Sequence, residues 1–242
     1  METPFTIETH TLDHARSVHV IRDDLVVGGT KVRGLLPYIR ASTQSEFIYA
    51  GPAYGYAQVA VARVCKDIGR RATLFVAKRN ALHPNTALAE SLGAKIIQVP
   101  YGYLVVVKKR ASDYCAECSN ERCLLPWGLK CDAYTNHLIE LLRAFEHDAA
   151  VCWVCVGSGT LFECLAAAQP TWRFKLVRIG AEYAVPDVLK ARVVAYYTAP
   201  EAYADRATVK PPYPSNLWYD AKTWRFVLQH ACDGELVWNV GA

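Results

Sequence analysis

Short apolar runs alternate with amphipathic segments along most of this chain, and this alternation limits the fold more than any other feature. The expected strands are nearly continuous apolar runs at 47–51, 72–77, 96–99, 149–156, 175–180 and 192–197. Helix-like segments separate them at 56–68, 85–92, 133–146, 161–168 and 221–230. Strands that are apolar on both faces are typical of parallel sheets covered by helices. The pattern therefore predicts an α/β fold built from repeated β-α-β units.

A compact β-α-β-α-β set predicts a smaller α/β domain at residues 48–122. We expect it to be inserted in a larger domain that comprises residues 1–47 and 123–242. Within the insert, Gly69 and Gly93 stand where helices usually end. Asn85 is expected to cap the helix at 85–92, because its side chain can accept a hydrogen bond from a free N–H of the first turn.

Composition narrows the class of protein without identifying it. The chain has 242 residues, of which 52% are hydrophobic and 21% charged, as in a soluble globular protein. No apolar run reaches the roughly 20 residues of a membrane-spanning helix. The first residues also lack the charged and apolar blocks of a secretory signal. We therefore expect a cytoplasmic protein with no membrane association, and the net charge of +4 permits an acidic partner without requiring one.

Nine cysteines are scattered over the chain, and an odd number cannot pair completely. Four of them could suggest a zinc site: Cys115, Cys118, Cys123 and Cys131. The gaps between them are 2, 4 and 7 residues long, unlike the spacing of paired CxxC motifs. We predict reduced, packed thiols and no metal site.

A glycine-rich turn follows the apolar run at 149–156 and precedes a helix. Glycines let backbone N–H groups approach an anion, and the start of a helix adds free donors and a favourable dipole. The turn is therefore a candidate phosphate site, although a tight βα connection has the same composition. Its residues are Gly157, Ser158, Gly159 and Thr160.

A second candidate is Lys31, which follows the Gly28-Gly29 pair and precedes Arg33. A lysine directly after such a turn is held by the backbone. An amine that forms an imine must be partly neutral, and burial or a neighbouring cation such as Arg33 lowers its pKa. An ordinary solvated lysine in a turn is the alternative.

Together these segments resemble a known family. Residues 28–39, GGTKVRGLLPYI, resemble the Gly-Gly-Asn-Lys segment of 1-aminocyclopropane-1-carboxylate deaminases and D-cysteine desulfhydrases. Further similar elements follow in the family's order at 125–128, 157–160, 219–222 and 237–242. The resemblance implies the tryptophan-synthase-β-like fold-type II architecture, with two open α/β domains, a cofactor cleft between them, and pyridoxal 5′-phosphate (PLP) as cofactor.

The resemblance also implies residue roles. Lys31 matches the lysine that holds PLP as a Schiff base, and residues 157–160 match the phosphate loop. Tyr219 matches a substrate-facing acid/base residue. Asp220 matches the residue at the pyridine nitrogen, where an acid keeps the ring protonated and able to accept electrons from a bond at Cα. Asp220 also suits the cap or first turn of the helix at 221–230.

One family element is altered. The Ser-Asn-His loop, which contacts cofactor and substrate carboxylate, aligns with Ala53-Tyr54-Gly55. Tyr54 or Tyr56 could supply a hydroxyl contact in its place, and we expect Tyr54 to contact the cofactor. Because the usual grip on the carboxylate is missing, the carboxylate itself becomes a candidate leaving group.

The resulting prediction is a PLP-dependent lyase that acts at Cα through a quinonoid intermediate. Compact proteins of this kind occur among viral enzymes that modify thymine in DNA. We predict a decarboxylase of an amino acid attached to a thymine base in DNA, acting as a homodimer in the host cytoplasm. The alternatives are a deaminase or desulfhydrase of a free small amino acid, a non-catalytic PLP-binding protein, and an α/β protein whose motifs match by coincidence.

Overall fold

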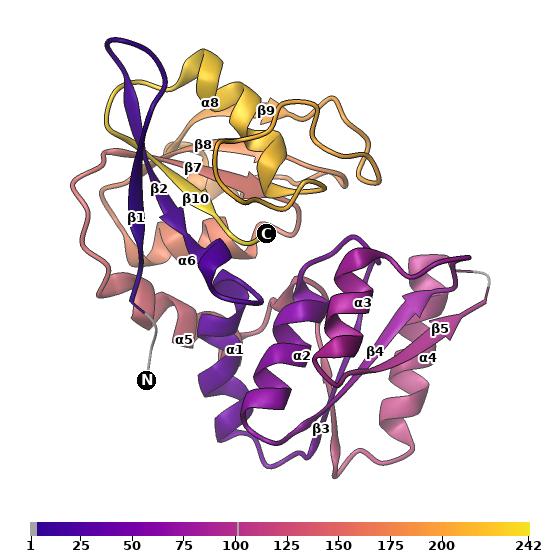
Figure 1. The fold of residues 1–242 in the computed structure, drawn as a ribbon. Helices are drawn as coiled ribbons and strands as arrows, with labels where there is room; N and C mark the ends of the chain where they lie inside the picture. The colour runs from indigo at the N-terminus through magenta and orange to yellow at the C-terminus, as the bar shows by residue number, and fades with distance from the viewer. Residues whose placement is uncertain (1–3, 101) are drawn as a thin grey trace. The chain divides into compact units, whose positions relative to one another are not determined.

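The computed structural model describes residues 4–100 and 102–242. The chain divides into two compact units (Figure 1). The first combines Met1–Thr30 with Leu138–Ala242, and the second is Lys31–His137. The second unit extends beyond 48–122 at both ends. One reason is that strand β3 (Glu46–Ala50) pairs with strand β6 (Arg122–Leu125), so these strands belong to one sheet.

The first unit contains a six-stranded sheet in the order β1-β2-β10-β7-β8-β9. Its edge strand β1 (Ile7–Thr11) is antiparallel to β2 (Ser17–Arg22), and the remaining pairs are parallel. The other strands are β7 (Val151–Val156), β8 (Arg173–Arg178), β9 (Val193–Thr198) and β10 (Glu235–Asn239). Helices α6 (Thr160–Ala168), α7 (Asp187–Lys190) and α8 (Trp224–His230) and the short 3₁₀ helices η1 (Asp23–Leu25) and η3 (Asp220–Thr223) complete it.

The second unit contains a four-stranded parallel sheet in the order β5-β4-β3-β6. Strands β4 (Arg71–Ala77) and β5 (Lys95–Val99) join the two strands given above. Helices α1 (Thr30–Ala41), α2 (Ala57–Asp67), α3 (Pro84–Ser91) and α4 (Leu104–Ala116) and the 3₁₀ helix η2 (Trp127–Leu129) flank these strands in the sequence. Helix α5 (Asp132–Arg143) contains the residues at which the chain passes from the second unit to the first. All five residues of β3 are buried, as a continuous apolar run predicts for a central strand.

The predicted α/β class is confirmed, and one helix cap is wrong. Gly69 and Gly93 have φ values of +68° and +96° just beyond α2 and α3, as expected for residues that end helices. The cap of α3, however, is His83, whose Nδ1 accepts from the backbone N–H of Asn85 at 3.2 Å. Pro84 explains the shift, because proline is favoured in the first helical position and moves the cap one residue before it.

Each sheet has a point where the order of its strands along the chain reverses. In the first unit it lies between β7 and β10, and in the second between β3 and β6. Ligands of open α/β sheets bind beyond the carboxyl ends of strands at such points. The topology therefore predicts ligand-binding loops at residues 157–160 and 240–242 in one unit, and at residues 51–56 and 126–131 in the other.

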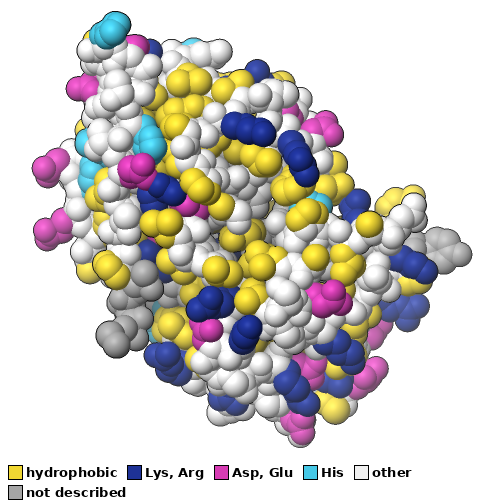
Figure 2. All heavy atoms as spheres, viewed as in Figure 1, with side chains coloured by type: hydrophobic (Ala, Val, Ile, Leu, Met, Phe, Trp, Pro, Cys, Tyr) yellow, Lys and Arg dark blue, Asp and Glu magenta, His cyan; other side chains and the backbone are white. Residues whose placement is uncertain are grey.

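The surface carries charges of both signs. Figure 2 shows Lys and Arg spread over the face in view with Asp and Glu among them, and no single basic patch dominates this face. Over residues 4–100 and 102–242, none of the helices is long and apolar enough to span a bilayer.

Candidate active site

The turn that carries Lys31 is fixed by the C-terminal strand. Gly29 has φ of +66°, and a Cβ built there would overlap the carbonyl oxygen of Val240. The next residue, Thr30, donates its N–H to that oxygen at 3.1 Å. Its buried hydroxyl donates to Asp23 Oδ2 at 2.6 Å and accepts from Trp238 Nε1 at 2.9 Å. Lys31 is the second residue of helix α1 and therefore directly follows a residue whose position buried hydrogen bonds determine.

The glycine-rich segment connects β7 to α6. Gly159 has φ of +78°, a left-handed conformation that favours glycine. The hydroxyls of Ser158 and Thr160 lie 3.0 Å apart at the first turn of the nine-residue helix α6. The segment thus combines glycine backbone, two hydroxyls and the free N–H groups of a helix start, which is the chemistry that a phosphate ester requires.

Two tyrosines pack against this loop so closely that its glycines have no room for a side chain. A Cβ at Gly157 would lie 2.8 Å from the Tyr219 hydroxyl. A Cβ at Gly159 would overlap the ring of Tyr183, whose hydroxyl donates to Glu163 Oε1 at 3.0 Å. These contacts fix the glycine backbone of the loop, whose N–H groups and hydroxyls fit the phosphate of PLP. Tyr183 was not predicted, because only the folded chain brings it to Gly159.

Both candidate cofactor segments follow strands of the six-stranded sheet, at the carboxyl ends of those strands. The Lys31 turn follows β2 and the glycine loop follows β7, and these parallel strands flank β10. Two interstrand spacings separate β2 from β7 by about 10 Å. Thr30 and residues 157–160 thus lie beyond the carboxyl ends of strands in the same sheet, at the point where the strand order reverses.

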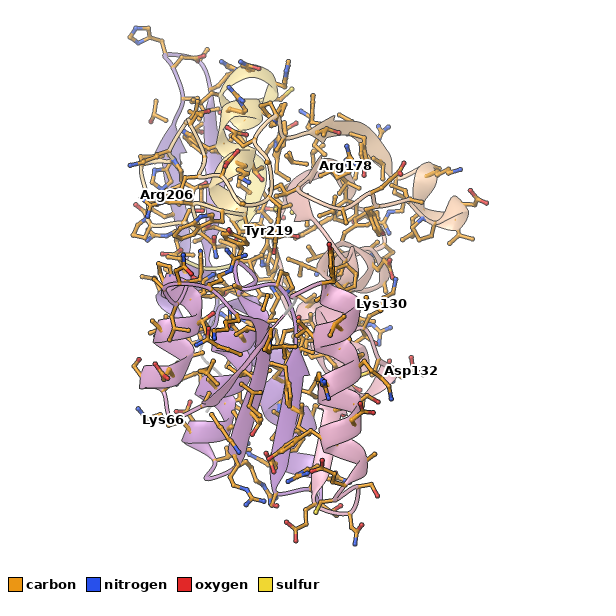
Figure 3. The ribbon with its side chains drawn as sticks, turned by 90° about the vertical axis from the view of Figure 1, so that its right-hand side faces the viewer. Lys66, Lys130, Asp132, Arg178, Arg206 and Tyr219 are labelled. Atoms are coloured by element: carbon orange, nitrogen blue, oxygen red, sulfur yellow. The ribbon has the colours of Figure 1, made fainter. Side chains whose placement is uncertain are left out.

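Tyr219, labelled in Figure 3, lies just before η3 with its hydroxyl beside Gly157. Burial raises its pKa well above the ordinary value of 10.0, and a hydrogen bond to Cys155 and the nearby Asp220 carboxylate raise it further. The phenol therefore stays protonated at neutral pH. It can donate a proton, and it does not act as a phenolate base.

Asp220 is the first residue of η3 and is only 6% exposed. Tyr219 occupies the cap position and makes no side-chain capping bond, so Asp220 is a first-turn acid and the cap interpretation is wrong. Its charge lies near Tyr213, whose pKa is raised mainly by burial and also by the Asp220 and Asp24 carboxylates. Asp220 is thus a buried acid in the unit that carries the glycine loop.

Lys222, two residues further on, received no role from the sequence. It is 1% exposed, and its ammonium group donates to the carbonyl of Ala202 at 2.8 Å. Burial lowers its pKa, while Glu201 opposes the shift. Lys222 therefore anchors the segment that follows β9 to the helix turn that presents Asp220.

Tyr54 lies in the second unit, in the loop that follows β3. Its hydroxyl accepts a hydrogen bond from Arg79 Nη1 at 3.1 Å, and its ring meets His83 edge-on with centroids 4.7 Å apart. The side-chain amide of Gln58 donates to the carbonyls of Ala53 and Gly55 at 2.7 and 3.0 Å, which fixes the loop. Tyr54 therefore has a fixed position at the carboxyl end of β3, and its contact with the cofactor stays a prediction.

The cysteines are unpaired thiols. Cys123 lies 3.4 Å from the Tyr38 hydroxyl, and burial raises its pKa. Burial also raises the pKa of Cys65 to about 12. Within the described ranges, no group of three or more His, Cys, Asp or Glu side chains is arranged to hold a metal ion.

The raised pKa of the buried phenols predicts that stability falls in alkaline solution. Tyr219 ionises near its ordinary value only when unfolded, so its contribution is present below about pH 10 and is lost as pH rises towards the folded-state pKa. Each such phenol adds up to about 1.4 kcal/mol per pH unit to the slope. We expect Tyr219→Phe to reduce the slope of the unfolding free energy between about pH 10 and 11 by this amount. An unchanged slope in urea titrations would mean that Tyr219 ionises normally.

Comparisons with known proteins agree with this architecture. No family model matches the chain. Among solved structures, an ACC deaminase homologue superposes with a TM-score of 0.79 at 16% identity, covering 100% of this chain and 89% of that one. O-ureido-L-serine synthase gives 0.71 at 15% identity, covering 99% and 89%. The T.th. threonine deaminase gives 0.69 at 15% identity, covering 94% and 87%. The chain therefore has the tryptophan-synthase-β-like fold of the fold-type II PLP enzymes, and the predicted fold is confirmed.

In sequence, the chain is similar to a particular protein of this class. The glycyl-dTMP PLP-dependent decarboxylase of Pseudomonas phage M6 is 23% identical over an alignment of 276 positions, which covers 97% of this chain and 97% of that protein. The similarity thus extends over both units.

Proposed function

We propose that this chain is a PLP-dependent lyase that decarboxylates an amino acid attached to a thymine base. The observation that carries the proposal is that the Lys31 turn and the glycine loop both follow parallel strands of the six-stranded sheet, at the carboxyl ends of those strands. The phage protein named as a glycyl-dTMP decarboxylase supports the choice of reaction, because it matches along nearly the full length of both chains.

Each candidate site residue has a proposed role. Lys31 holds PLP as a Schiff base, residues 157–160 bind its phosphate, and the Tyr54 hydroxyl contacts it from the loop after β3. When bound, PLP withdraws electrons from the bonds at Cα of an attached amino acid. Asp220 keeps a proton on the pyridine nitrogen. The chain thus supplies an amine, an anion cradle and a buried acid for one cofactor.

The reaction breaks the bond between Cα and the carboxylate. Carbon dioxide leaves, and the electron pair that remains at Cα takes a proton, which leaves an amine on the base. Tyr219 or Lys31 supplies this proton, and the raised pKa of Tyr219 keeps its phenol in the protonated form at neutral pH. The loop at residues 51–56 favours this outcome, since it lacks the Ser-Asn-His element that fixes a carboxylate that stays.

The test is to incubate PLP-loaded protein with glycyl-thymine substrates whose carboxyl carbon is labelled. We expect labelled carbon dioxide and a new primary amine on the base. Ammonia with retention of the label would identify a deaminase instead. A visible imine band without turnover of any amine would identify a non-catalytic PLP-binding protein, and no imine would refute the proposal.

The proposal also concerns the molecule that carries the substrate and the oligomeric state of the protein. We propose that DNA carries the substrate in the host cytoplasm and that the protein is a homodimer. Modified oligonucleotides should then react as readily as the mononucleotide, and light scattering should give twice the mass of 26.9 kDa. A monomeric mass, or turnover restricted to the mononucleotide, would contradict the corresponding aspect.

A further inference from the structure

We infer that Arg79, oriented by the ring of Tyr54, binds the phosphate of the nucleotide to which the amino acid is attached; these two side chains form the Arg79–Tyr54 pair. The inference rests on the proposed function, because it concerns a thymine nucleotide as substrate. It assigns to Arg79 the non-reacting, anionic part of that molecule and leaves the Tyr54 hydroxyl to the cofactor.

The pair is held in a defined geometry. Arg79 Nη1 donates to the Tyr54 hydroxyl at 3.1 Å, and the guanidinium carbon lies 4.7 Å from the centre of the Tyr54 ring. The backbone N–H of Arg79 donates to Gln98 Oε1 at 3.3 Å. The side-chain amide of Asn85 donates to the Tyr54 carbonyl at 2.9 Å. Both side chains therefore start from anchored backbone, and an exposed arginine is oriented by a neighbouring ring.

The charge of Arg79 is not neutralised locally. Arg79 is exposed, and none of the carboxylates in the described ranges forms an ion pair with it. The segment 78–89 contains Lys78, Arg79 and His83 but no acidic residue. In contrast, Arg63 in the same unit pairs with Asp67 at 2.8 Å. Arg79 thus keeps a full charge and N–H donors that Tyr54 does not use, and a planar guanidinium suits the oxygens of a phosphate.

The position of the pair suits a ligand site. Tyr54 follows β3 and Arg79 follows β4, and these strands are parallel neighbours in the middle of the sheet (Figure 1). Both residues therefore lie beyond the carboxyl ends of their strands, where ligands of open α/β sheets bind. The Tyr54 loop also replaces the element with which similar enzymes contact their substrates.

Phosphate is a better occupant than the carboxylate that leaves. A cation fixed against that carboxylate would stabilise the charge that decarboxylation removes, and would bind the ground state more tightly than the transition state. The same cation on a group that does not react contributes binding without this penalty.

The test separates binding from turnover. For PLP-loaded protein, the affinity for unmodified thymidine 5′-monophosphate is compared with that for thymidine by calorimetry. We expect Arg79→Ala to weaken monophosphate binding by about tenfold at low salt and to leave thymidine binding unchanged. Arg63→Ala removes an equal charge from the same unit and is expected to leave both unchanged. The kcat/KM ratio of glycyl-thymine nucleotide to nucleoside should fall by a similar factor in Arg79→Ala alone.

The outcomes are distinct. Equal loss for phosphate and non-phosphate ligands, or no loss, would refute the phosphate assignment, and equal loss of turnover on both substrates would move Arg79 to the carboxylate. If the wild type decarboxylates nothing, the proposed function fails, whereas the binding comparison still decides the role of Arg79. An unchanged imine absorbance in Arg79→Ala confirms that the variant is folded and loaded.

Discussion

Replacing Lys31 with alanine is expected to abolish the visible imine band of the PLP-loaded protein and to lower decarboxylation by at least about a hundredfold. The reason is that Lys31 is proposed both to hold the cofactor and to move a proton at Cα, and proton transfer by a placed group alone contributes about 10²- to 10⁴-fold. Borohydride reduction followed by peptide mapping should label Lys31 in the wild type and nothing in Lys31→Ala.

Two control variants separate this role from charge and folding. Lys66 is an exposed lysine on α2, and Lys66→Ala should keep both the band and the activity. Lys31→Arg keeps the positive charge but cannot form an imine, because arginine stays protonated. If Lys31→Arg retained the band, or if borohydride labelled another lysine, Lys31 would not be the attachment residue.

The sequence predicted most of the two sheets because their strands are apolar on both faces. Strands β1, β2, β6 and β10 were not predicted. Strand β1 is an exposed edge strand, in which four of five residues are exposed. Strand β10 is fully buried but contains Glu235, whose partners are Trp153 at 2.7 Å and Lys175 at 2.7 Å. These partners lie 82 and 60 residues away, so periodicity alone could not reveal a buried acid as part of a strand.

Helix α1 is a different kind of omission. It begins directly after two glycines and contains Pro37, and both features argue against a helix in an isolated sequence. The structure starts the helix there because Thr30 is tied to Val240, Asp23 and Trp238. Local preference is thus overruled by contacts made across the chain.

The residues of the candidate site also fall into those that the sequence could reveal and those that it could not. Residues adjacent in the sequence, such as those of the glycine loop and the Tyr219-Asp220 pair, could be found as motifs. Pairs that arise from folding could not. Arg79 and Tyr54 are 25 residues apart, and Tyr183 and Glu163 are 20 apart. Their roles became visible only when the ends of neighbouring strands and loops were placed together.

Replacing Gly29 with alanine is expected to lower the free energy of unfolding of the first unit by about 3 kcal/mol or more. A residue with a side chain at φ of +66° carries about 1 to 3 kcal/mol of backbone strain. The new Cβ would also overlap the Val240 carbonyl, which cannot move without weakening its hydrogen bond to Thr30. That bond contributes about 0.5 to 1.5 kcal/mol. Since Lys31 lies two residues after Gly29, imine formation with PLP should weaken as well.

A matched glycine separates the overlap from the backbone strain. Gly234 lies in the same unit with φ of +74°, and a Cβ there would meet nothing within 4 Å. Gly234→Ala should therefore show the strain alone, about 1 to 3 kcal/mol, without the further loss from the overlap, and an unchanged affinity for PLP. Urea unfolding followed by tryptophan fluorescence is suitable, because Trp127 is the one tryptophan of the six outside the first unit. Equal losses in the two variants would show that the approach of Gly29 to Val240 does not fix the turn. The backbone would then not be what positions Lys31.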